Sequence, residues 1–132
     1  MRHDRQDDLL LARAIHAAFA ATGAPPPIAP GDERLRRLAE RHVVALDGDG
    51  RILMAHPFAA HRDGARVTSG DREWWGNCAW DAFGIVVALG LAEATVASDG
   101  IELDVRDGRA EGDVIFHVAV PARAWWDDIG FT

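Results

Sequence analysis

The chain has 132 residues, 48% of them hydrophobic, and a formal net charge of −7. This length suits one compact domain, or a small N-terminal module fused to a slightly larger one. The acidic balance argues against a broad surface for nucleic acid or anionic membrane. No apolar stretch is long enough to span a bilayer, and the charged N-terminus lacks a signal-peptide core. A single cysteine excludes an internal disulfide. We therefore expect a cytoplasmic protein with neither a membrane nor a nucleic-acid partner.

Two helices and a hairpin are predicted in residues 1–56. Apolar residues recur at helical spacing from Asp7 to Ala21, and a second helix is expected from Glu33 to Arg41 with Asp32 as its N-cap. Residues 42–46 and 51–55 read as strands joined by two Asp-Gly pairs, which are a strong hairpin signal. Helix, helix and hairpin form the outline of a winged-helix module.

Such a module can bind DNA or serve only as a scaffold. Four arginines are expected to point outward: Arg34, Arg36, Arg37 and Arg41. In a DNA-binding module they would face the groove. The hairpin tip, however, would bring Asp47 and Asp49 against phosphate. The net charge and this tip favour the scaffold.

Residues 57–132 are expected to form a mixed core. A short strand at 66–68 precedes a helix from Cys78 to Leu89 that ends at Gly90, and strands follow at 94–97, 101–105 and 114–120. One buried helix with several strands predicts an α+β fold. The predicted organisation is therefore an N-terminal part, 1–56, and a core, 57–132.

Cys78 is the residue most indicative of chemistry. A thiol at a helix N-terminus faces unpaired N–H groups and the positive end of the helix dipole, which favour the thiolate. Asp81 lies three residues further on, so both side chains share a face of the helix and the carboxylate can accept the thiol proton. This pattern predicts an accessible thiol of lowered pKa. The alternative is a small buried cysteine beside an ordinary first-turn aspartate.

The histidines do not suggest a zinc site. The chain has six of them, and none stands at a spacing typical of zinc ligands. His117, on the strand expected at 114–120, is interpreted as a core or edge residue. The other histidines are interpreted as surface or structural residues.

Two motifs resemble the organomercurial (alkylmercury) lyase family. They are Ala-His-Pro-Phe at 55–58 and Trp-Gly-Asn-Cys-Ala-Trp-Asp at 75–81, followed by a helix ending in Leu89-Gly90. The resemblance implies protonolysis of a carbon–mercury bond, which the family performs with two cysteines and an aspartate. Cys78 matches the first cysteine, which is also a mercury ligand, and Asp81 matches the aspartate. These 132 residues lack the second cysteine, and Trp126 falls at or near its expected place.

The resemblance further implies a small-molecule substrate, a detoxification role and no cofactor, mercury being substrate or product. Two alternatives stay open. In one, Cys78 attacks a carbon-centred substrate in a small enzyme, and the five tryptophans wall an apolar pocket. In the other, the protein binds a soft metal or regulates without catalysis. The expected substrate-binding residues are Trp75, Trp80 and Trp126, and the oligomeric state stays open.

Overall fold

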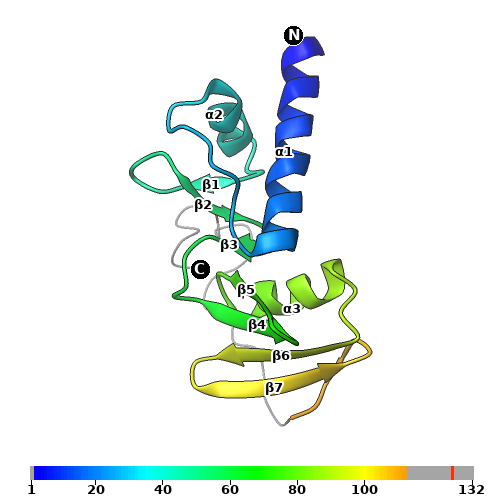
Figure 1. Cartoon of the computed structure of the whole chain (residues 1–132). Coiled ribbons are helices and arrows are strands. Elements are labelled where there is room, and N and C mark those ends of the chain that lie inside the picture. The colour runs from blue at the N-terminus through cyan, green and yellow to red at the C-terminus, as the bar shows by residue number, and fades with distance from the viewer. Residues whose placement is uncertain (1, 113–125, 127–132) are drawn as a thin grey trace.

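The computed structural model describes residues 2–112 and residue 126, and this part of the chain has a mixed α+β fold. Its three helices are α1 (Arg2–Thr22), α2 (Glu33–Glu40) and α3 (Ala79–Ala88). Its strands form two antiparallel sheets (Figure 1). The predicted α+β class is therefore confirmed. The strand expected at 114–120, with His117, lies outside the described residues, as does Trp125.

Helix α1 is longer than predicted, since it begins at Arg2 rather than Asp7. Asp8 consequently lies within the helix, fully buried, and its carboxylate accepts hydrogen bonds from the Arg37 guanidinium of α2 at 2.8 to 3.2 Å. Arg41 lies 3.9 Å from the same carboxylate. The expectation that Arg37 points outward was wrong, because a buried carboxylate needs a cationic partner.

The smaller sheet follows α2. Asp32 caps that helix by accepting from the N–H groups of Arg34 and Leu35, as predicted. Strands β1 (Ala45–Leu46) and β2 (Ile52–Ala55) form the expected hairpin, and β3 (Phe58–Ala59) adds a third strand that the sequence did not indicate. The winged-helix interpretation of this part stays a prediction.

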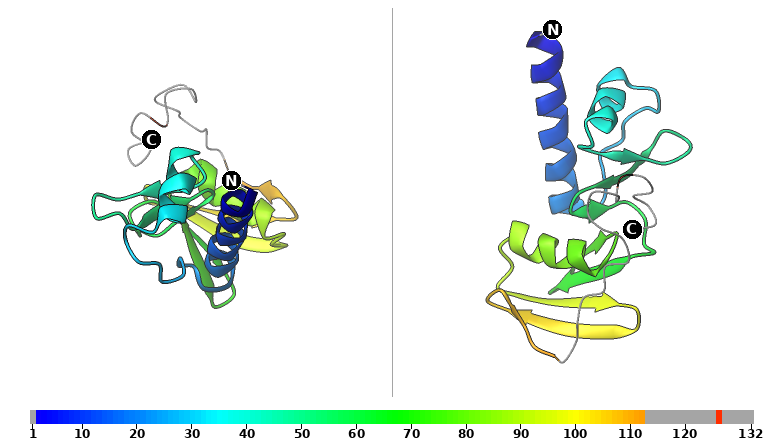
Figure 2. Two further views of the ribbon diagram at one scale, coloured as in Figure 1. Left: turned by 90° about the horizontal axis from the view of Figure 1, so that it is seen from above. Right: turned by 180° about the vertical axis from the view of Figure 1, so that it is seen from behind.

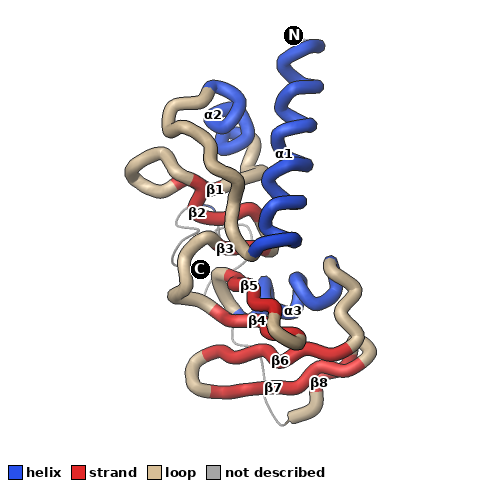
Figure 3. Tube along the Cα trace, in the orientation of Figure 1, coloured by secondary structure: helices blue, strands red, loops and turns tan. Residues whose placement is uncertain are grey.

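The larger sheet has the order β5-β4-β6-β7-β8. Its strands are β4 (Ala65–Ser69), β5 (Arg72–Gly76), β6 (Glu93–Ser98), β7 (Ile101–Arg106) and β8 (Arg109–Ala110). Both β5 and β6 pair antiparallel with β4, and α3 connects β5 to β6 along the chain. Helix α3 packs against β4, β5 and β6 and so covers one face of the sheet (Figure 3). This connection places the N-terminus of α3 directly after β5.

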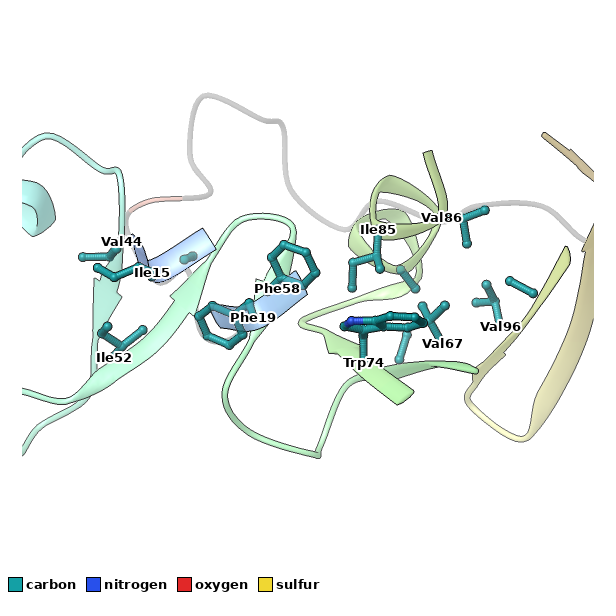
Figure 4. Packing of buried hydrophobic residues seen from close by; sticks show 14 of the residues in the cluster. Ile15, Phe19, Val44, Ile52, Phe58, Val67, Trp74, Ile85, Val86 and Val96 are labelled. Atoms are coloured by element: carbon teal, nitrogen blue, oxygen red, sulfur yellow. The ribbon is translucent and has the colours of Figure 1, made fainter. Parts of the chain in front are cut away.

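One hydrophobic core joins the two sheets (Figure 4). Phe19 of α1 stacks on Phe58 of β3 with ring centroids 5.5 Å apart. Trp74 of β5 is 1% exposed, and its indole N–H donates to the Ala20 carbonyl oxygen at 3.0 Å. The C-terminal end of α1 thus reaches the larger sheet, while its N-terminal end points away from it (Figure 2).

The boundary between residues 56 and 57 is not marked by a break in this core, because buried residues on both sides of it belong to the same cluster. The division into two parts stays a prediction. The described part of the chain contains no helix that is long and apolar enough to cross a bilayer.

Candidate functional site

Cys78 is the N-cap residue of α3, with an extended backbone (φ −146°, ψ 176°) and a half-buried side chain. The preceding turn is tight. A Cβ on Gly76 would lie 2.8 Å from the Ala82 nitrogen and 3.0 Å from the Asp81 Cβ. Only glycine therefore allows strand β5 to pass this close to the first turn of α3.

The loop that precedes Cys78 is also held by residues between β3 and β4. His61 Nε2 lies 2.9 Å from Asn77 Oδ1, and the backbone N–H of Asp63 donates to His61 Nδ1 at 3.2 Å. A Cβ on Gly64 would lie 2.0 Å from the Gly76 carbonyl oxygen. The residues between β3 and β4 thus pack directly against the chain that carries Cys78.

The structure brings Cys78 and Asp81 together. The Cys78 Sγ lies 3.5 Å from Asp81 Oδ2, within the range of a thiol–carboxylate hydrogen bond. The Asp81 side chain is 15% exposed. The expectation that the two side chains share a face at the start of this helix is confirmed.

The expected lowering of the Cys78 pKa was wrong in sign. Burial raises the pKa of the Cys78 thiol, and the negative charge and acceptor oxygen of Asp81 raise it further. The backbone N–H groups of Asp81 and Trp80 lower that pKa, but they are outweighed. Cys78 therefore retains its proton more firmly than an ordinary cysteine.

His56 is a member of this cluster that the sequence did not indicate. Its Nδ1 lies 3.5 Å from Asp81 Oδ1, so the carboxylate has the thiol at one oxygen and the imidazole at the other. The His56 carbonyl oxygen lies 3.1 Å from His16 Nε2, which ties this position to α1. His56 precedes the Pro-Phe motif, but its pairing with Asp81 depends on how the turn between β2 and β3 packs against α3, and no spacing rule reveals it.

Trp126 reaches the same neighbourhood. Its ring stacks on His42 with centroids 4.2 Å apart and meets the His56 ring edge-on at 5.5 Å. It also packs against the small cluster of Ala45, Met54 and Ala59. Trp126 is thus connected to Asp81 through His56.

The other tryptophans are placed differently. Trp74 belongs to the core rather than to a pocket wall. Side chains alternate along β5, so Trp75 lies on the sheet face away from α3, where its N–H donates to Glu73 Oε1 at 2.8 Å. Trp80, in the first turn of α3, is 61% exposed. Of the three expected substrate-binding tryptophans, Trp126 is the one whose ring lies against His56, the partner of Asp81.

A resident metal centre is not formed by the described residues. Within 2–112 and 126, no group of three or more histidine, cysteine, aspartate or glutamate side chains could hold a metal ion. Cys78 is the single thiolate that the chain offers to a soft metal. A metal ion that binds Cys78 would therefore have to carry further ligands of its own.

Comparison with known proteins identifies the region that carries this site. The family model described as alkylmercury lyase (MerB) matches residues 58–132, which are more than half of the chain. The match includes Cys78, Asp81 and Trp126 and begins two residues after His56. Neither a curated protein nor a solved structure matches the chain.

Proposed function

The chain belongs to the alkylmercury lyase family, and on this premise we propose that it cleaves the carbon–mercury bond of a small organomercurial through Cys78 and Asp81. The observation that carries the proposal is the 3.5 Å contact between the Cys78 sulfur and the Asp81 carboxylate. A soft thiolate is a strong mercury ligand, and a carboxylate beside it can hold and deliver a proton. Both residues lie inside the matched region.

In the first step, the organomercurial arrives as R–Hg–SR′, bound to a small thiol. The Cys78 sulfur forms a bond to mercury and loses its proton to Asp81, while R′S⁻ leaves. The result is Cys78–S–Hg–R beside a protonated Asp81. The raised pKa of Cys78 fits this step, because the proton that the sulfur retains is the one that the carbon later needs.

In the second step, Asp81 transfers that proton to the carbon bonded to mercury. The Hg–C bond breaks and its electron pair forms the new C–H bond, so R–H leaves and Asp81 is again a carboxylate. A second thiolate binds mercury as the carbon departs. Because Cys78 is the single cysteine of the chain, this thiolate comes from outside these 132 residues. Mercury is thus substrate and product, not a resident cofactor.

The same pKa direction argues against Cys78 as an activated nucleophile for a carbon-centred substrate. Such enzymes depend on a thiolate that is already present near neutral pH. Burial and Asp81 instead favour the neutral thiol. Mercury can displace the thiol proton because its bond to sulfur is strong, whereas an ordinary carbon electrophile has no comparable affinity.

We further propose that residues 1–56 serve as a scaffold for the site rather than as a DNA-binding module, whether or not their arrangement is called winged-helix. His56 and His42 support this proposal, since they contact Asp81 and Trp126 respectively. A thiol-dependent reaction and a free cysteine suit the reducing cytoplasm and a detoxification role. We propose Trp126, rather than Trp75 or Trp80, as the aromatic residue beside the substrate.

The proposed function is tested by headspace gas chromatography of hydrocarbon released from methylmercury and phenylmercury, with a small thiol in excess. Wild type is expected to release methane or benzene, Cys78→Ser to release none, and Asp81→Asn to be slowed at least a hundredfold, as for loss of a proton donor. Asp71→Asn makes the same chemical change at an exposed turn and should match wild type. Activity that survives in Cys78→Ser would refute the proposal.

A further inference from the structure

The His56 imidazole is in an unusual position for a buried polar ring. Its Nδ1 lies 3.5 Å from Asp81 Oδ1, while its Nε2 is buried and, among the described residues, has no hydrogen-bond partner. A buried donor without an acceptor is costly, so the position of the ring proton matters.

The two neutral tautomers of His56 differ sharply in this setting. With the proton on Nε2, a buried N–H would lack an acceptor, and the Nδ1 lone pair would face the carboxylate oxygen. With the proton on Nδ1, the N–H lies beside Asp81 Oδ1, at an N···O distance of 3.5 Å, and only a lone pair is left at Nε2. The second arrangement places the donor next to a carboxylate acceptor and removes the repulsion between lone pairs.

We infer that His56 is a positioning residue for Asp81: its Nδ1–H holds Oδ1, so that Oδ2 stays directed at the Cys78 sulfur. This inference rests on the proposed function and adds a residue that lies outside the region matched by the family model. The 3.5 Å separation is longer than an ordinary N–H···O hydrogen bond, and contacts of this kind commonly tighten when substrate binds.

Neighbouring side chains hold His56 in place for this role. The His16 ring, on α1, contacts the His56 carbonyl oxygen at 3.1 Å, and the Trp126 ring lies edge-on against the imidazole. The side chain of His56 is 33% exposed, so the ring is partly enclosed by these groups. A carboxylate held at both oxygens loses little orientational freedom when a proton must be delivered to one point.

His61 provides an internal control for the tautomer. Its Nδ1 accepts from the Asp63 N–H, so its proton must be on Nε2, which faces Asn77 Oδ1 at 2.9 Å. The two histidines are therefore expected in opposite tautomers in the same protein. Long-range ¹⁵N–¹H spectra of histidine-labelled protein, recorded where the rings are neutral, distinguish the two forms.

In wild type, His56 should show the Nδ1–H pattern and His61 the Nε2–H pattern. In Asp81→Ala, His56 should shift toward Nε2–H, because its acceptor is lost, while His61 should be unchanged. An Nε2–H pattern for His56 in wild type, or an identical His56 pattern in the two proteins, would overturn the inference. This comparison does not require any turnover.

Kinetics supply the second measurement. His56→Phe keeps a ring against Trp126 but removes the N–H, and should lower kcat for methylmercury cleavage by about tenfold to a hundredfold with KM changed less than about twofold. His56→Asn places an amide N–H near the position of Nδ1 and should recover most of the loss. Equal loss in both variants would contradict positioning by the N–H. An inactive wild type would count against the proposed function, and the spectra would still decide the role of His56.

Discussion

The Cys78 thiol and the Asp81 carboxylate lie 3.5 Å apart at the start of α3, where burial and this contact raise the pKa of the sulfur instead of lowering it. Burial is the largest cause, and the carboxylate adds to it because a neighbouring negative charge disfavours a thiolate. The helix N-terminus acts in the opposite direction but does not prevail. The thiol therefore gives up its proton less readily than an ordinary cysteine.

The first prediction concerns the pH dependence of Cys78 alkylation. The half-maximal iodoacetamide rate should occur above the pH for an ordinary cysteine, about 8.5. Asp81→Asn removes a contribution that raises the pKa, so its profile should move to lower pH. A wild-type midpoint below that of a free cysteine, or a profile that moves upward in Asp81→Asn, would show that the helix N-terminus dominates.

The second prediction concerns the close packing behind the site. Gly64→Ala would place a Cβ 2.0 Å from the Gly76 carbonyl oxygen, and backbone cannot yield as a flexible side chain can. We expect a loss of about 3 kcal/mol in the free energy of unfolding, at the upper end for overpacking, together with faster alkylation of Cys78. Gly48→Ala is the matched control, since nothing lies within 4 Å of its Cβ position. It should stay within about 0.5 kcal/mol of wild type in urea denaturation.

The third prediction concerns the buried carboxylate between α1 and α2. Hydrogen bonding from Arg37 lowers the pKa of Asp8, the first of several contributions. The pKa of Asp8 in the folded protein is below its value in the unfolded chain, which is about 3.9. The stabilisation is therefore complete at a pH above the unfolded pKa, and it is lost as the pH falls through the folded pKa. Asp8→Asn should cost about 2 kcal/mol near neutral pH, and its difference from wild type should shrink below about pH 4. Exposed Asp7→Asn should be nearly neutral at both pH values.

The fourth prediction is weak DNA binding by the N-terminal part. Each arginine that a winged-helix interpretation would assign to a groove has an acidic partner within the protein. These pairs are Arg34–Asp32, Arg36–Glu33, Arg36–Glu40, Arg37–Asp8 and Arg41–Asp8. Few phosphates can then be neutralised, and non-specific affinity depends on that number. Fluorescence anisotropy with random duplex at low salt should detect no binding at micromolar protein; a salt-sensitive signal would contradict the scaffold proposal.

The parts of the site that the sequence predicted are the local ones. The spacing of Cys78 and Asp81 on one helix turn depends only on helix geometry, so it was visible in the sequence. The end of that helix was visible for the same reason. A chain that leaves a helix often adopts a positive φ, which favours glycine, and Gly90 has a φ of +60°. Local patterns also revealed the hairpin around Asp47–Gly50.

What the sequence did not predict depends on tertiary contacts. The pairing of His56 with Asp81 requires the turn between β2 and β3 to meet α3, and the sign of the Cys78 pKa shift depends on how deeply the fold buries the thiol. Strand β5 was missed because Trp74 and Trp75 are both large and apolar, which hides the alternation between its faces. Only the fold distinguishes them, with Trp74 in the core and Trp75 on the opposite face.

The last prediction concerns the second ligand of mercury. The described residues hold no three-ligand metal group, and Cys78 is the only thiol of the chain, so the product Cys78–S–Hg needs a thiolate from solution. Methane release from methylmercury should therefore rise with the concentration of added small thiol and fall to at most one equivalent without it. A dithiol should be more effective than a monothiol at equal sulfur concentration, because it removes mercury from Cys78 as a chelate. Multiple turnovers without added thiol would contradict this prediction, because mercury would then leave Cys78 without an external thiolate.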